Sequence, residues 1–238
     1  MIIHRHTLRD VAYRPVLDLQ RRMMSCLVDR KRRGLDILSH HIFMVEHSPV
    51  YTLGRHGHRE NLINPGLLSD NNIELVEIER GGDITFHGPG QLVVYPIIDL
   101  QHYHLGVKDY VALLEQAVID TIASFGIKGK RVEGATGVWV DTPWGECKIC
   151  AIGVKCSRFV TMHGLALNVS TPLHYFNAIN PCGFTDCGVT SMAMLTTPPC
   201  DRQSSEAPES SNGYRKPEWE PVADELFNNL VKLLRERK

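Results

Sequence analysis

Apolar residues recur at helical spacing in three stretches of the chain, with polar residues on the opposite face of each. In the first stretch Val16, Leu19, Met23 and Leu27 share one face, and Gly34 is the expected end of the helix. The other two helices are expected from Tyr110 to Phe125, capped by Asp109, and from Pro221 through Leu233. The pattern therefore predicts one helix near the start, one in the middle and one at the end.

Short apolar runs between these helices predict β-strands, because glycine, proline or polar residues bound each run. The runs are Ile2–Leu8, Ile42–Glu46, Val50–Leu53, Ile73–Ile78, Leu92–Ile98, Val138–Val140, Lys148–Val154 and Leu165–Val169. Pro96 cannot donate a hydrogen bond to a neighbouring strand, so we expect its strand to be at an edge or irregular there. Strands gathered between helices, rather than alternating with them, indicate the α+β class.

Composition adds limits to this picture. The 238 residues suit one domain, 1–238, but the stretch from about 196 to 217 is rich in proline and serine and predicts a flexible polar insert. A net charge of −1 and the absence of any apolar run near 18 residues argue against nucleic-acid binding and a membrane span. Seven unevenly spaced cysteines favour a reducing compartment. Cys147, Cys150 and Cys156 lack a fourth ligand at standard spacing, so no metal is expected.

A glycine-rich segment from Arg80 to Gln91 separates two predicted strands. Four of its twelve residues are glycine, and it is longer than a two-residue hairpin turn. Glycine allows the backbone to approach a ligand closely, and Arg80 and His87 contribute a fixed positive charge and a titratable ring. A purely structural turn is the alternative interpretation. The polar groups beside apolar strands favour a binding site.

Two further residues have reactive side chains in suggestive surroundings. Cys182 lies between Pro181 and Gly183, a context that presents a thiol on a loop, where it can act as a nucleophile if its pKa is lowered. Lys148 opens an apolar strand, where burial and a neighbouring thiol would let it exchange protons. For each residue the alternative is structural: an inert buried cysteine, and a lysine that extends from a strand edge to solvent.

Together these stretches resemble the octanoyl-(acyl-carrier protein):protein N-octanoyltransferases of lipoate biosynthesis. The resemblance rests on Arg80-Gly81-Gly82 with Thr85, on the run from His87 to Gln91, on Lys148 with Ala151-Ile152-Gly153, on the run from His163 to Val169, and on Pro181-Cys182-Gly183. It implies the fold of biotin and lipoate protein ligases, with a mixed sheet, a smaller sheet and flanking helices. It also implies that Cys182 and Lys148 are catalytic. The implied substrate-binding residues are Arg80, Gly81, Gly82, Asp83, Ile84, Thr85, Phe86, His87, Ala151, Ile152, Gly153, Gly164, Leu165 and Ala166.

The resemblance implies an acyltransferase that needs neither ATP nor a metal. Its donor would be octanoyl-acyl carrier protein, which holds the acyl group on phosphopantetheine. Its acceptors would be lipoyl domains of 2-oxoacid dehydrogenase complexes and the glycine cleavage H protein. A monomer is expected, in the mitochondrial matrix if the source is eukaryotic, which is favoured, and otherwise in the cytoplasm. The alternatives are an ATP-dependent lipoate or biotin ligase on the same fold and a non-catalytic acyl-carrier-binding relative.

Overall fold

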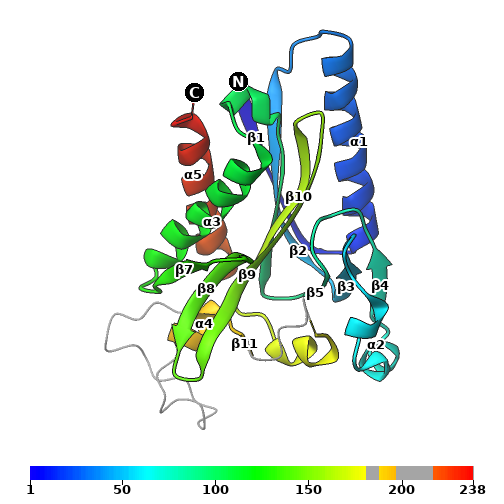
Figure 1. Ribbon diagram of the computed structural model, residues 1–238, viewed down its shortest axis with the longest axis vertical. Coiled ribbons are helices and arrows are strands. Elements are labelled where there is room, and N and C mark those ends of the chain that lie inside the picture. The colour runs from blue at the N-terminus through cyan, green and yellow to red at the C-terminus, as the bar shows by residue number, and fades with distance from the viewer. Residues whose placement is uncertain (181–187, 197–216, 238) are drawn as a thin grey trace.

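The computed structural model describes residues 1–180, 188–196 and 217–237 (Figure 1). Their strands form two sheets. In spatial order the larger sheet holds β1 (Ile2–Val11), β2 (Ser39–His47), β6 (Gln91–Ile97), β10 (Val160–Asn168), β9 (Gly145–Ser157), β8 (Ala135–Thr142) and β7 (Gly129–Val132), and β11 (Gly188–Val189) pairs with β9. The smaller sheet holds β4 (Glu74–Glu77), β3 (Val50–Leu53) and β5 (Ile84–His87) in that order.

Helices cover both faces of the larger sheet. The α-helices are α1 (Tyr13–Arg32), α2 (Pro65–Asp70), α3 (Val107–Ala123), α4 (Met192–Thr196) and α5 (Trp219–Arg235), and the 3₁₀ segments are η1 (Arg59–Asn61), η2 (Leu100–Tyr103) and η3 (Leu173–Ala178). Helix α1 lies on one face, and α3 and α5 lie on the other, while the smaller sheet sits beside the lower end of α1 (Figure 1). Each face of the larger sheet has its own apolar core. A third apolar core lies between the smaller sheet and the segments α2 and η3. No helix among the described residues is long and apolar enough to cross a membrane.

The predicted α+β class is confirmed, and so are the expected strands and the three long helices. Asp109 is not the cap of α3: the cap position is Gly106, and Asp109 lies in the first turn. A carboxylate there still interacts favourably with the positive end of the helix dipole. The predicted insert falls almost entirely on residues 197–216, outside the described part of the chain.

Pro96 shows how the larger sheet accommodates a proline in its interior. The expectation of an edge strand is wrong, since β6 lies between β2 and β10. The expectation of an irregular position is confirmed, because the pairing of β6 with β10 stops at Val94 and Leu165. Beyond that point His163 has a φ of +59°, and the Thr161 hydroxyl donates to the Pro96 carbonyl at 2.8 Å. The proline therefore falls where the ladder with β10 has already ended, while on its other side β6 remains paired with β2.

Candidate active site

A cavity of about 1440 Å³ collects residues from the glycine-rich segment, β9 and β10. These segments are far apart in the sequence, but the smaller sheet places the glycine-rich segment against the larger sheet. The lining includes Arg80, Gly81, Gly82, Asp83, Ile84, Thr85, His87, Lys148, Ala151, Ile152, Gly153, Gly164, Leu165 and Ala166. The structure thus places these residues of the implied site around one space, whereas Cys182 lies outside the described residues.

Close backbone contact holds the glycine-rich segment against β9. The Gly81 N–H donates to the Val154 carbonyl at 3.0 Å. A Cβ at Gly153 would lie 2.7 Å from the Gly81 oxygen, so a larger residue would push the two backbones apart. Gly82 has a φ of +84°, which glycine adopts without strain. The glycines therefore serve both the bend of the chain and its approach to the sheet.

Arg80 binds protein atoms around the bend. Its Nη2 donates to the Thr52 carbonyl at 2.8 Å and to the Thr52 hydroxyl at 3.0 Å, and its Nη1 donates to the Gly81 carbonyl at 3.0 Å. The residue is 8% exposed, so its charge sits in the wall of the cavity. Arg80 thus ties strand β3 to the segment that carries Gly81 and Gly82.

Phe86 is the one described residue of the implied binding set that the structure places elsewhere. The expected glycine-rich loop contains strand β5, in which successive side chains point to opposite faces. The Phe86 ring is fully buried in the core of the small sheet and stacks on Tyr175 with the ring centres 4.5 Å apart. Its neighbours Thr85 and His87 line the cavity instead.

Lys148 lies on β9 with its ammonium over the face of Trp139, 4.7 Å from the ring centre. Trp139 is its register partner on β8, and Val189 of β11 is its partner on the other side. The Thr190 N–H donates to the Lys148 carbonyl at 3.0 Å. Residues 188–190 are therefore held beside the lysine, and Gly188 follows Cys182 by six residues in the sequence.

A polar network links Thr190, which lies beside Lys148, to the glycine-rich segment. Gln91 donates from Nε2 to the Phe86 carbonyl and to Oδ1 of Asn168, so its Oε1 accepts from Nδ1 of His87 at 2.8 Å. Asn168 in turn donates to the Thr190 carbonyl at 3.0 Å. Burial lowers the pKa of His87 to about 3, so the ring is neutral and its proton stays on Nδ1. The network fixes the orientation of a ring in the cavity wall.

Tyr13, Tyr95 and His47 form a second buried group beside the cavity, which the first two residues line. His47 donates from Nδ1 to the Val11 carbonyl at 3.1 Å, so its Nε2 accepts from the Tyr95 hydroxyl at 2.9 Å. Burial lowers the pKa of His47 to about 4 and raises that of Tyr13 to about 12. These groups are neutral near pH 7. Sequence reasoning missed these three residues, because in the sequence they lie far from the glycine-rich segment or inside apolar runs.

Helix α3 and the β7–β8 hairpin form the remaining wall, which sequence reasoning also missed. Glu115 is 8% exposed, and it accepts from Arg131 at 2.9 Å and from the Gly137 N–H at 3.1 Å. A buried carboxylate on the inner face of a helix is the one signal that could have marked this wall. The described residues contain no group of His, Cys, Asp and Glu side chains arranged to hold a metal ion.

Comparison with known proteins identifies the family. The model of the lipoyl protein ligase A/B catalytic domain matches residues 15–206. The chain belongs to this family. An octanoyltransferase of Parabacteroides distasonis is 48% identical over 199 residues, which cover 82% of this chain and 90% of that protein. An octanoyltransferase of Bacteroides thetaiotaomicron is 52% identical over 185 residues, 76% of this chain and 81% of that protein.

These relatives confirm the family inferred from the sequence motifs and, with it, an acyltransferase enzyme. They are bacterial proteins, so the expected mitochondrial location gains no support from them.

Solved structures confirm the fold of this lipoyl protein ligase family member. A lipoate-protein ligase A bound with ATP has a TM-score of 0.61 at 15% identity, covering all of this chain and 85% of that one. P. falciparum LipL1 in complex with lipoate has a TM-score of 0.66 at 11% identity, covering 99% of this chain and 64% of that one. The biotin protein ligase of Aquifex aeolicus has a TM-score of 0.52 at 9% identity, covering 99% and 71%. At these identities the likeness concerns architecture alone.

Proposed function

We propose that this acyltransferase moves an octanoyl group from the phosphopantetheine thioester of acyl carrier protein to a lysine of lipoyl domains, through a thioester on Cys182. One observation carries the proposal: Lys148 and the three motif segments line a single cavity in a chain about half identical to octanoyltransferases. The lipoyl domains would be those of 2-oxoacid dehydrogenase complexes and the glycine cleavage H protein, and the enzyme would act as a monomer.

In the first half-reaction the Cys182 thiolate attacks the carbonyl carbon of the donor thioester. The new carbon–sulfur bond forms as the bond to phosphopantetheine breaks. The leaving sulfur takes the proton of the Lys148 ammonium, so the carrier departs with a free thiol and Lys148 is left neutral. A positive charge near a thiol favours its ionised, nucleophilic form, which is the role proposed for the Lys148 ammonium. The residues that follow the thiol segment support this arrangement, because Val189 pairs with Lys148.

In the second half-reaction the amine of the acceptor lysine attacks the Cys182 thioester. The amide bond forms, the carbon–sulfur bond breaks, and Lys148 accepts the proton that the attacking nitrogen must lose. Exchange of one thioester for another is nearly isoenergetic, and conversion of a thioester to an amide is downhill. The proposed reaction therefore needs no ATP and no metal.

The acyl chain would lie along Ala151, Ile152, Leu165 and Ala166, apolar residues of β9 and β10 that line the cavity. Their side chains present a hydrocarbon surface next to the sheet. Burial of the chain from water contributes about 0.8 kcal/mol for each methylene group. The cavity wall thus offers the apolar surface that a medium-chain acyl group requires.

The test is the intact mass of the protein after mixing with octanoyl-acyl carrier protein in the absence of ATP. The expected result is a covalent octanoyl adduct that disappears when a lipoyl domain is added. Cys182→Ser should form no thioester adduct, while Cys26→Ser, at an exposed cysteine on α1, should behave like the wild type. An adduct or a product that requires ATP would instead indicate a ligase. Carrier-protein binding without any adduct would indicate a non-catalytic relative.

A further inference from the structure

His163 is a buried histidine in the cavity wall with unusual surroundings. It is 1% exposed, lines the cavity and has a φ of +59°. Within the part of the chain that the structure describes, neither ring nitrogen has a hydrogen-bond partner. Buried polar groups are nearly always paired, so an unpaired imidazole beside a ligand cavity calls for a functional explanation.

Gln20 of α1 extends this polar region. Its Oε1 accepts from the backbone N–H of His163 at 2.9 Å, and its residue is fully buried. The amide Nε2 of Gln20 also has no partner among the described residues. Two neighbouring side chains, from a helix and from the strand beneath it, thus leave buried polar atoms unpaired at one place.

This polar region lies at the end of the cavity that is remote from Lys148. The register partner of His163 is Val154, and the Val154 carbonyl accepts from Gly81, where the glycine-rich segment closes over β9. Val154 is six residues beyond Lys148 on β9, which corresponds to about 20 Å at roughly 3.3 Å per residue. An extended lysine side chain of about 6 Å and an eight-carbon chain of about 9 Å, at standard bond lengths, span most of that distance.

We propose that His163, together with Gln20, forms the polar closed end of the acyl pocket and determines the length of the acyl chain that the enzyme accepts. This inference rests on the proposed function. An octanoyl chain ends beside the apolar residues of β9 and β10. A longer chain presses its terminal methylene groups against unpaired ring nitrogens and an unpaired amide, which is unfavourable because the hydrocarbon cannot form hydrogen bonds with them.

The charge state of the His163 imidazole agrees with a polar, uncharged side chain at this end of the pocket. Burial, and then the nearby Arg80 charge, lower the pKa of His163 to about 3. The ring is therefore uncharged at working pH, so the histidine contributes polarity but no charge to this end of the pocket. It limits a hydrocarbon by polarity and by volume.

The positive φ of His163 allows a substitution that removes the side chain without straining the backbone. Glycine adopts a positive φ without strain, so His163→Gly removes the imidazole and keeps the backbone. Asparagine also tolerates this region, so His163→Asn keeps a shorter polar group there. His104→Gly is the matched control, because His104 has a φ of +53° but is exposed and does not line the cavity.

The experiment compares the rates of acyl-enzyme formation from hexanoyl, octanoyl, decanoyl and dodecanoyl carrier protein, with thermal unfolding as the check of folding. In His163→Gly the decanoyl-to-octanoyl ratio should rise roughly tenfold, close to the value expected for burying two further methylene groups. His163→Asn should raise it about two- to threefold, and His104→Gly should leave it unchanged.

An unchanged ratio in a folded His163→Gly that still forms the octanoyl adduct would overturn the inference. If that variant does not fold, an unchanged ratio in His163→Asn would do the same. Failure of the proposed function is a separate result, since the wild type would then form no adduct with any of the four donors.

Discussion

The ammonium of Lys148 lies over the indole of Trp139, 4.7 Å from the ring centre, on neighbouring strands of the larger sheet. The indole is itself fixed, because its Nε1 donates to the Ala135 carbonyl at 2.9 Å and the residue is 2% exposed. A cation over the face of a tryptophan is attracted by roughly 0.5–2 kcal/mol, depending on its exposure to water. The contact therefore holds the amine in one place at the cavity wall.

Lys148→Met and Lys148→Arg should fail at different steps of the proposed reaction. Methionine removes the charge that favours the thiolate, so the first half-reaction should slow by at least tenfold. Arginine keeps the charge but cannot release its proton at ordinary pH, so acyl-enzyme should form and then accumulate. Rapid-quench mass spectrometry measures both steps. Turnover of the arginine variant at the wild-type rate would show that Lys148 is not the base.

Replacement of Trp139 tests whether the position of the amine matters. In Trp139→Leu the lysine retains its charge but loses the ring beneath it, so we expect about a tenfold fall in the rate of the second half-reaction. The preference among acyl chain lengths should not change, since His163 lies on β10, which β9 separates from the β8 strand of Trp139. A fall in the rate that comes only from unfolding would appear in the thermal midpoint.

Gly82→Val tests the glycine-rich segment. Valine is strained at a φ of +84°, and any shift of this segment moves Arg80 and Gly81 in the cavity wall. We expect acyl transfer to be lost while far-ultraviolet circular dichroism stays close to that of the wild type. Gly34→Val is the control, because Gly34 has a φ of +67° at the end of α1 and nothing lies within 4 Å of its added Cβ. Equal transfer by the two variants would count against a ligand role for Gly82.

Periodicity predicted the secondary structure because the long helices and central strands have clear apolar faces. It did not predict β5 within the glycine-rich segment, since a strand of four residues is too short to show alternation. That strand is the reason that Phe86 lies in the core of the small sheet instead of the cavity. The short strands β7 and β11 were not predicted for the same reason.

The candidate site was predictable where the motifs are contiguous in sequence. Arg80, Lys148, Gly153 and Gly164 carried recognisable patterns, and the fold brings them to one cavity. His163 stood inside a motif, but its positive φ and its unpaired ring nitrogens are properties of the tertiary structure alone. The wall formed by α3 was missed because its residues follow an ordinary amphipathic pattern, from which the buried carboxylate of Glu115 departs.

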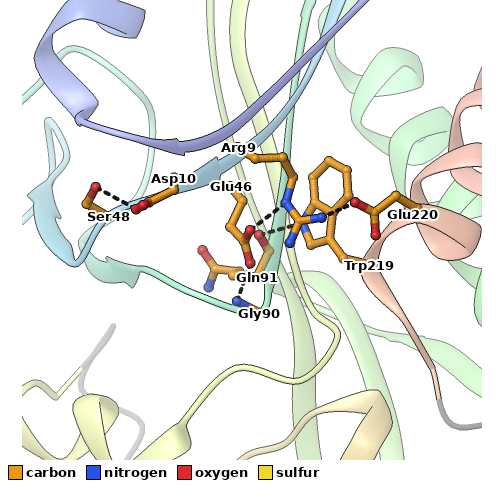
Figure 2. Close-up of polar contacts among 8 residues, drawn as sticks. All are labelled: Arg9, Asp10, Glu46, Ser48, Gly90, Gln91, Trp219 and Glu220. Atoms are coloured by element: carbon orange, nitrogen blue, oxygen red, sulfur yellow. Dashed lines mark hydrogen bonds and ion pairs between the residues drawn. The ribbon is translucent and has the colours of Figure 1, made fainter.

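The turn before β6 is held from outside the cavity by Glu46 (Figure 2). Glu46 accepts from the Gly90 N–H at 2.7 Å and from Nε of Arg9 at 2.6 Å, and Arg9 also lies over the Trp219 ring at 4.6 Å and pairs with Glu220. The Glu46 side chain is 11% exposed and that of Glu220 is 62% exposed. The two carboxylates should therefore differ in their effect on stability.

Glu46→Ala should lower the free energy of unfolding by roughly 1–3 kcal/mol, because it leaves the Gly90 N–H without its acceptor and Arg9 without its less exposed carboxylate. Glu220→Ala removes a partly exposed ion pair and should cost under about 1 kcal/mol. Urea unfolding at pH 7.5 measures both values. Equal losses in the two variants would show that the Glu46 contact to the turn does not contribute to stability.

The last prediction concerns acid stability, because three histidines are buried in neutral form around the cavity. Burial lowers the pKa to about 4 for His47 and to about 3 for His87 and His163, against about 6.5 in the unfolded chain. Between these values the unfolded chain binds more protons than the native protein, so stability falls as the pH drops below 6.5. Each histidine contributes a loss of about 1.4 kcal/mol per pH unit in that window.

Urea unfolding at pH 7.5, 6.5, 6.0 and 5.5 should show a nearly constant stability down to about pH 6.5 and then a steepening loss. His6 and His41, whose pKa values burial also lowers, act in the same direction. Glutamine cannot take up a proton. Between pH 6.0 and 5.5 the free energy of unfolding of His87→Gln should therefore fall less steeply than that of the wild type, by about 1.4 kcal/mol per pH unit, the value for one proton. If wild type and variant lost stability with the same slope, His87 would not be neutral and buried in solution. If neither lost stability, the same conclusion would extend to all three rings, and none of them would be a neutral part of the cavity wall.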